Sequence, residues 1–104
     1  MTETDVEVVT KVKIDTDIKP PTRYSVVYLN DDKTSANFVA QSLIDVFGYS
    51  IDEALAKTKE IDEHGSGEVT SGLARELATH LRDVVIMRAR TENFPLVVEI
   101  KEEE

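Results

Sequence analysis

The sequence predicts an α+β fold, in which three helices pack on a three-stranded antiparallel sheet within one small domain. Two observations predict it. Runs of β-branched and aromatic residues occur at 24–29 and 96–100, with a shorter run at 68–70. Three other segments repeat apolar residues at helical spacing. The expected order is β-α-α-β-α-β, with a core domain over residues 23–104.

Residues 1–22 are predicted to be a flexible N-terminal extension, because charged residues surround a few aliphatic ones and Pro20-Pro21 closes the segment in extended geometry. The valines give the segment some strand character, which leaves open strand pairing, either locally or on a partner. The first residues are acidic and contain no long apolar run, so the segment does not resemble a signal peptide.

The strand at 24–29 ends in Asn30-Asp31-Asp32, residue types that favour turns because their short side chains bond neighbouring backbone groups. A helix is expected over 35–47, with Gly48 stopping it in left-handed geometry. Ser50 and Glu53 form a capping box that starts a second helix, which ends near residue 63. The residues expected on the inner side of that helix are Ile51, Ala54, Leu55, Thr58 and Ile61.

The sequence from His64 to Gly67 is predicted to be a break, followed by a short strand at 68–70. Leucines at 73, 77 and 81 and valines at 84 and 85 then predict the longest helix, near 72–90. Pro95 prevents this helix from continuing into the last strand at 96–100.

The composition excludes several classes of function. A formal net charge of −9 argues against binding nucleic acid or an anionic membrane surface. No segment has the ~18 consecutive apolar residues that span a bilayer. The absence of cysteine excludes disulfides, zinc–thiolate sites and a thiol nucleophile, and it permits the cytoplasm.

An enzyme would have to begin from Asp31 and Asp32, with His64 or His80. Adjacent carboxylates point in different directions, so an acid–base or metal site needs further ligands. The glycines at 65 and 67 lack the lysine and the helix of a phosphate loop. We therefore expect no catalytic residues, no metal and no cofactor. Asp62 is out of place locally, because it lies near the negative end of the second helix.

Four motifs together resemble the ClpS family of adaptor proteins. They are PPTRYSVVYLNDDKT, the helix ending in FGYS, the break at HGSGEV and the closing RTENFPLVV. The resemblance covers about residues 20–100. It implies a non-enzymatic adaptor that binds N-degron substrates, which are proteins with a destabilising, typically large hydrophobic N-terminal residue. The adaptor would deliver them to a Clp AAA+ unfoldase and its proteolytic partner.

The resemblance also implies roles for the turn after the first strand. Asn30 and Asp31 would bind the α-amino group of the substrate, and Asp32 and Thr34 would shape the rim and accept bonds from the substrate backbone. The family usually has a histidine in this site where the present chain has Asp62. The carboxylates of Asp31, Asp32 and Asp62 would then lie close together, and like charges would raise one another's pKa values.

An alternative alignment brings His64 into the histidine position, but that residue comes two positions too late. We therefore take Asp62 as the equivalent, and its carboxylate would still accept from an ammonium group.

A hydrophobic pocket for the first side chain is expected beside the amine site. By resemblance it is lined by Val39, Ile61 and Leu96, with Ala36 and Thr58 in place of two methionines that usually guard it. The smaller side chains predict a wider and partly polar pocket, and a shift of specificity towards β-branched or otherwise unusual first residues.

Glu76 matches a position that faces the unfoldase in the family, whereas Leu81 stands where the family often has a lysine. The implied partners are substrate N-termini and the N-terminal domain of a ClpA- or ClpC-like unfoldase. The protein is expected to be a monomer in the cytoplasm, or in the plastid stroma of a plastid-bearing organism. Two alternatives stay open: a module that modulates the unfoldase without recognising N-degrons, and a small hydrolase or metal-binding protein.

Overall fold

A computed structural model describes residues 21–103 and contains the expected order of elements. Strand β1 (Tyr24–Leu29) is followed by α2 (Ala36–Phe47), α3 (Ile51–His64), β2 (Ser66–Leu73), α4 (Arg75–Thr91) and β3 (Val97–Glu102). The sheet has the order β2-β1-β3, and both neighbours are antiparallel to β1. The predicted fold class is therefore confirmed. Residues 1–20 of the predicted flexible extension lie outside the described part, and the division at residue 22 stays a prediction.

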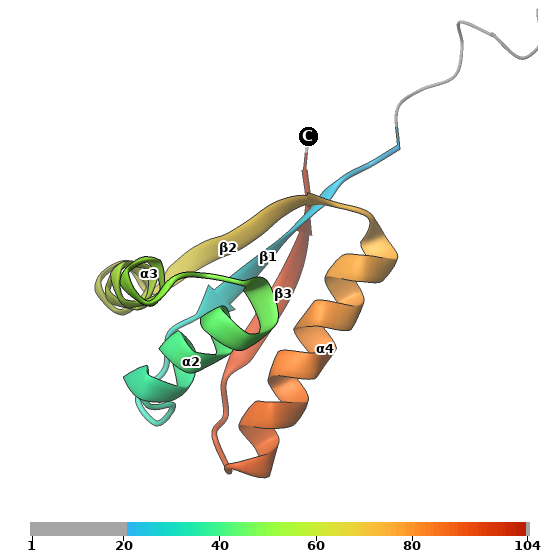
Figure 1. Cartoon of the computed structure of the whole chain (residues 1–104). Coiled ribbons are helices and arrows are strands. Elements are labelled where there is room, and N and C mark those ends of the chain that lie inside the picture. Colours follow the sequence, from blue (N-terminus) through green and yellow to red (C-terminus); the bar gives the residue numbers. More distant parts are fainter. Residues whose placement is uncertain (1–20, 104) are drawn as a thin grey trace, which may run out of the picture.

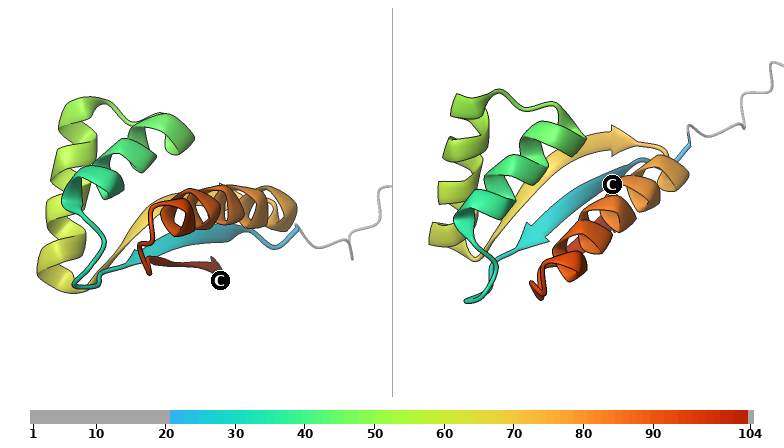
Figure 2. Two further views of the ribbon diagram at one scale, coloured as in Figure 1. Left: turned by 90° about the horizontal axis from the view of Figure 1, so that it is seen from below. Right: turned by 60° about the horizontal axis from the view of Figure 1, so that its bottom comes forward.

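Helices α2 and α4 lie on one face of the sheet and α3 lies at its β2 edge, as Figures 1 and 2 show. Helix α4 packs against β3 and β1, α2 packs against α4 and α3, and α3 packs against β2. Within residues 21–103, no helix is long and apolar enough to cross a membrane.

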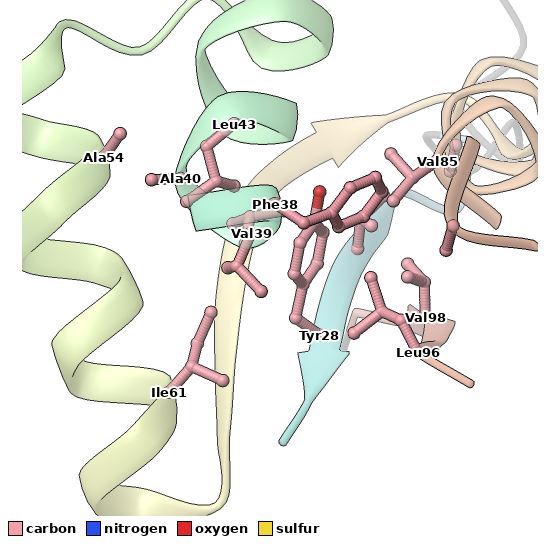
Figure 3. Close-up of a cluster of buried hydrophobic side chains, with 14 residues drawn as sticks. Tyr28, Phe38, Val39, Ala40, Leu43, Ala54, Ile61, Val85, Leu96 and Val98 are labelled. Atoms are coloured by element: carbon pink, nitrogen blue, oxygen red, sulfur yellow. The ribbon is translucent and has the colours of Figure 1, made fainter. Parts of the chain in front are cut away.

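The core runs between α2, α4 and the central strand (Figure 3). Tyr28 and Leu43 are fully buried in it, and the rings of Phe38 and Phe94 meet edge to face with centroids 5.4 Å apart. The hydroxyl of Ser42 donates to the carbonyl oxygen of Val39 at 2.8 Å, so it accepts the hydrogen of Tyr28 Oη, 2.7 Å away. This short chain of bonds satisfies both buried hydroxyls, which would otherwise be costly to desolvate.

The predicted helix boundaries between α2 and α3 are confirmed. Gly48 ends α2 with a φ of 76°, and Ser50 and Glu53 exchange both hydrogen bonds of a capping box. The inner face of α3 was predicted too broadly. Ala54 and Ile61 are buried, but Ile51 and Leu55 are more than half exposed because α3 packs at the edge of the sheet.

Strand β2 is longer than the sequence indicated. It begins at Ser66 and runs to Leu73, so Leu73 belongs to this strand and α4 begins only at Arg75. Gly67 is buried in β2 opposite Tyr28, and a Cβ atom built on it would lie 2.7 Å from Cγ1 of Ile61. Glycine is therefore required here by the close approach of α3, and it does not mark the end of a strand.

Candidate functional site

One cavity of about 570 Å³ opens where the end of β1, the start of α2 and the second half of α3 meet. A hydrogen bond of 2.9 Å from the backbone N–H of Asn30 to the carbonyl oxygen of Gly65 joins these segments. Gly65 is the C-cap of α3, with a φ of 87°. The bond brings the turn that follows β1 beside the last turn of α3, which carries Asp62.

The cavity brings together most of the site residues predicted from the sequence. Its lining is Asn30, Asp31, Asp32, Thr34, Ala36, Asn37, Val39, Leu55, Thr58, Lys59, Ile61 and Asp62. Nine of these were predicted as site residues, and Asn37, Leu55 and Lys59 were not. Leu55 was expected inside the protein, and the exposed positions of Asn37 and Lys59 depend on how α2 and α3 face each other.

Two predicted site residues lie elsewhere. Leu96 is 1% exposed and belongs to the hydrophobic core, and it is not among the residues that line the cavity, so its role in the pocket stays a prediction. Glu76 is exposed on the first turn of α4. It follows the end of β2, which pairs with Tyr24 at the start of β1, whereas Asn30 follows the other end of β1. Glu76 and the cavity are therefore at opposite ends of the sheet.

Asp31 is fixed by the turn in which it lies. Its Oδ1 accepts from the backbone N–H groups of Lys33 at 2.8 Å and Thr34 at 2.7 Å, and its Oδ2 accepts from the Thr34 hydroxyl at 2.7 Å. A carboxylate can accept about four hydrogen bonds, so roughly one acceptor position remains free for a ligand. Further acceptors for an ammonium group would have to come from the other polar residues of the cavity wall.

These bonds also set the protonation of Asp31. Burial acts to raise its pKa, but the hydrogen bonds from the Thr34 hydroxyl and from the two backbone groups outweigh this effect, so the pKa lies below its ordinary value. The expectation that neighbouring carboxylates would raise this pKa is wrong for Asp31. The carboxylate is therefore charged at neutral pH and already held in place.

The floor of the cavity is apolar. Ile61 is 2% exposed and Val39 is buried, and both belong to the hydrophobic core as well as to the cavity. The Thr58 hydroxyl donates to the carbonyl oxygen of Ala54 at 2.7 Å. Its hydrogen is used within α3, so Thr58 adds less polarity to the pocket than the sequence suggested. The site thus combines an acidic wall with an apolar floor.

The histidines take no part in this site. His64 is the exposed last residue of α3 and does not line the cavity, and His80 is exposed on α4. Among residues 21–103, no group of three or more histidine, aspartate or glutamate side chains could hold a metal ion.

The fold and the cavity define a small α+β domain with one pocket suited to a ligand that has a cationic end and an apolar end. Comparison with known proteins identifies its family. Residues 19–99 match the family model described as ATP-dependent Clp protease adaptor protein ClpS, so the chain belongs to the ClpS family of Clp protease adaptors.

Relatives named ATP-dependent Clp protease adapter protein ClpS support this assignment. One from Campylobacter jejuni is 34% identical over 88 residues, which cover 85% of this chain and 91% of the relative. One from Oleidesulfovibrio alaskensis is 36% identical over 91 residues, which cover 88% of this chain and 86% of the relative. The structure of Agrobacterium tumefaciens ClpS2 bound to L-phenylalaninamide superposes with a TM-score of 0.78 at 28% identity, covering 81% of this chain and all of the other.

Proposed function

We propose that this protein is a non-enzymatic adaptor that binds the N-terminal residue of N-degron substrates and delivers them to a Clp AAA+ unfoldase. The observation that carries the proposal is the cavity itself, in which Asn30, Asp31 and Asp62 share one space with Val39 and Ile61. The L-phenylalaninamide bound to the Agrobacterium relative has an amino group beside an apolar side chain, which is the chemistry that this arrangement suits.

Two partial sites explain how a single terminal residue can be recognised. An ammonium group is costly to remove from water unless acceptors surround it, and each charge-assisted hydrogen bond to it contributes roughly 1.5–3 kcal/mol. Burial of one leucine or phenylalanine side chain contributes a further ~1.5–3 kcal/mol. An internal residue has no ammonium group and a polar first residue has no apolar side chain, so each would lose one of the two contributions.

In this proposal Asp31 is the preorganised acceptor, and Asn30 and Asp62 complete the site for the α-amino group. Asp32 and Thr34 lie at the rim, where the backbone of the substrate would pass. Ala36, Val39, Thr58 and Ile61 surround the first side chain, and Leu96 supports this wall from the core.

The test is binding of peptides that begin with Leu, Phe, Ile or Val, each with a free or an acetylated N-terminus, measured by fluorescence anisotropy. Peptides with a free N-terminus are expected to bind, and acetylation is expected to weaken their affinity at least tenfold. This factor corresponds to one ammonium hydrogen bond of about 1.4 kcal/mol. Equal affinity of the two forms would contradict the proposed amine site.

Asp62 has a matched control in the chain. Asp62→Asn removes a carboxylate from the cavity, whereas Glu63→Gln removes the same charge from the adjacent residue, which does not line the cavity. We expect Asp62→Asn to weaken binding of free peptides several-fold and Glu63→Gln to leave it within about twofold. Equal effects of the two variants would indicate that peptide binding responds only to the net charge of the protein.

Delivery requires a second measurement. Degradation of a fluorescent reporter with an N-terminal phenylalanine by a ClpA- or ClpC-type unfoldase and its peptidase is expected to accelerate when the adaptor is added. Glu76→Ala on the exposed start of α4 is expected to reduce this acceleration without changing peptide affinity. An adaptor that binds the unfoldase but no free peptide would support the alternative role of a modulator, which the small side chains of Ala36 and Thr58 keep open.

A further inference from the structure

Lys59 is the only cationic side chain among the described residues that line the cavity. It shares this space with the carboxylates of Asp31, Asp32 and Asp62. A positive charge beside a site for an α-amino group opposes binding of that group, by Coulomb repulsion. The position of Lys59 therefore calls for a second role.

Lys59 lies at the outer edge of the cavity. It follows Leu55 by four residues on α3, so the two side chains are neighbours on one face of the helix. Leu55 is 56% exposed and the Lys59 side chain is 74% exposed, whereas Ile61 on the floor is 2% exposed. In the proposed complex, the mouth through which a bound chain would leave includes this outer edge as well as the rim at Asp32 and Thr34.

The ammonium group of Lys59 is available to a ligand. Its partner is Glu63, whose Oε2 lies 3.9 Å from Nζ, and both side chains are exposed to solvent. Exposed pairs at this separation contribute little to stability. Lys57, two residues earlier, differs in both respects, because its Nζ lies 3.1 Å from Oε1 of Glu60 and its side chain is only 22% exposed.

We propose that Lys59 is a specificity-determining residue that favours substrates with an acidic second residue. This inference rests on the proposed function, since it concerns the residue that follows the one in the pocket. A carboxylate on the second residue would exchange for Glu63 as the partner of Lys59. A lysine or arginine at the same position would instead face the ammonium group of Lys59 at the exit.

The chain offers a matched control for this proposal. Lys57→Gln removes the same charge from the same helix, but Lys57 lines a separate cavity formed with Phe47 and Tyr49. The two variants have the same net charge, so any difference between them reports the local position of the charge. Lys59→Arg keeps the charge and serves as the rescue variant.

The experiment measures binding of three peptides that begin Phe-Glu, Phe-Gln and Phe-Lys and are otherwise identical. The wild-type protein is expected to bind Phe-Glu at least as tightly as Phe-Lys, although its formal net charge is −9. Lys59→Gln is expected to shift the affinity ratio towards Phe-Lys by about three- to tenfold, a range set by the strength of exposed ion pairs acting on two peptides of opposite charge. Lys57→Gln should shift the ratio by less than about twofold, and Lys59→Arg should restore the wild-type ratio.

The inference is overturned if Lys59→Gln leaves the ratio unchanged, or if Lys57→Gln shifts it equally. Failure of the proposed function has a different signature. In that case none of the three peptides binds the wild-type protein, or acetylation of the N-terminus has no effect on any of them.

Discussion

Gly67→Ala tests how closely β2 and α3 are packed beneath the cavity. The added Cβ would lie 2.7 Å from Cγ1 of Ile61, and ordinary carbon–carbon contacts are about 3.5–4.0 Å. Ile61 would therefore have to move by roughly 1 Å. It is buried in the core, so its neighbours offer little room for this shift.

The expected cost follows from this contact. Overpacking by one methyl group in a well-packed core destabilises by about 1–3 kcal/mol, and replacement of glycine by alanine recovers about 0.4–1 kcal/mol through the unfolded state. Gly67 is not among the glycines with a positive φ, so no backbone strain is added. The net loss of unfolding free energy is expected to be at most about 2.6 kcal/mol. Because Ile61 also lines the cavity, peptides with a bulky first residue should bind about threefold to tenfold more weakly.

Urea unfolding and peptide anisotropy would measure the two effects. Gly48→Ala is the control, because Gly48 has a φ of 76° and open space around its Cβ position. It is expected to lose stability through backbone strain without changing peptide affinity. In an Ile61→Ala background the cost of Gly67→Ala should disappear, which leaves only the gain of about 0.4–1 kcal/mol through the unfolded state. A cost that persists at full size in that background would refute the role assigned to Ile61.

Three further variants test the buried hydroxyls and the fixed carboxylate. Ser42→Ala should lower the free energy of unfolding in urea by about 1–3 kcal/mol, because it leaves the hydroxyl of Tyr28 without a partner. Tyr28→Phe should lower it by only about 0.5–1.5 kcal/mol, because Ser42 keeps its bond to Val39. Equal costs of the two variants would contradict this order. The lowered pKa of Asp31 means that its contribution to stability is present above its unfolded pKa, near 3.9, and is lost as the pH falls through the lower folded value. Thr34→Val removes one donor, so the carboxyl resonance of Asp31 should titrate at a higher pH by NMR than in the wild type, and an unchanged titration would show that the hydroxyl bond is unimportant.

Local patterns in the sequence were sufficient for much of the fold. The Gly48 stop and the capping box at Ser50 depend on contacts within a few residues, and both occur in the structure. The same holds for the strand at 24–29, whose β-forming residues end in an Asn-Asp-Asp turn. Family membership was also recognisable, because the motifs that carry it lie in these local elements.

The errors lie where one element meets another. Helical spacing predicted that Leu55 faces the interior, but α3 covers only the edge of the sheet, so Leu55 lies at the mouth of the cavity. Gly67 suggested a break, whereas it allows Ile61 to approach β2. Neither fact can be read from one segment, because each depends on the distance between two segments.

The sequence by itself determined the elements, their order and the residue types at the turn after β1. The tertiary structure decided that Asn30 bonds to Gly65 and so brings Asp31 and Asp62 to one cavity. It also decided that Lys59 lines the same cavity. The physical reason is that hydrogen bonds and side-chain periodicity act over a few residues, whereas a cavity is formed by packing between segments that are distant in the chain.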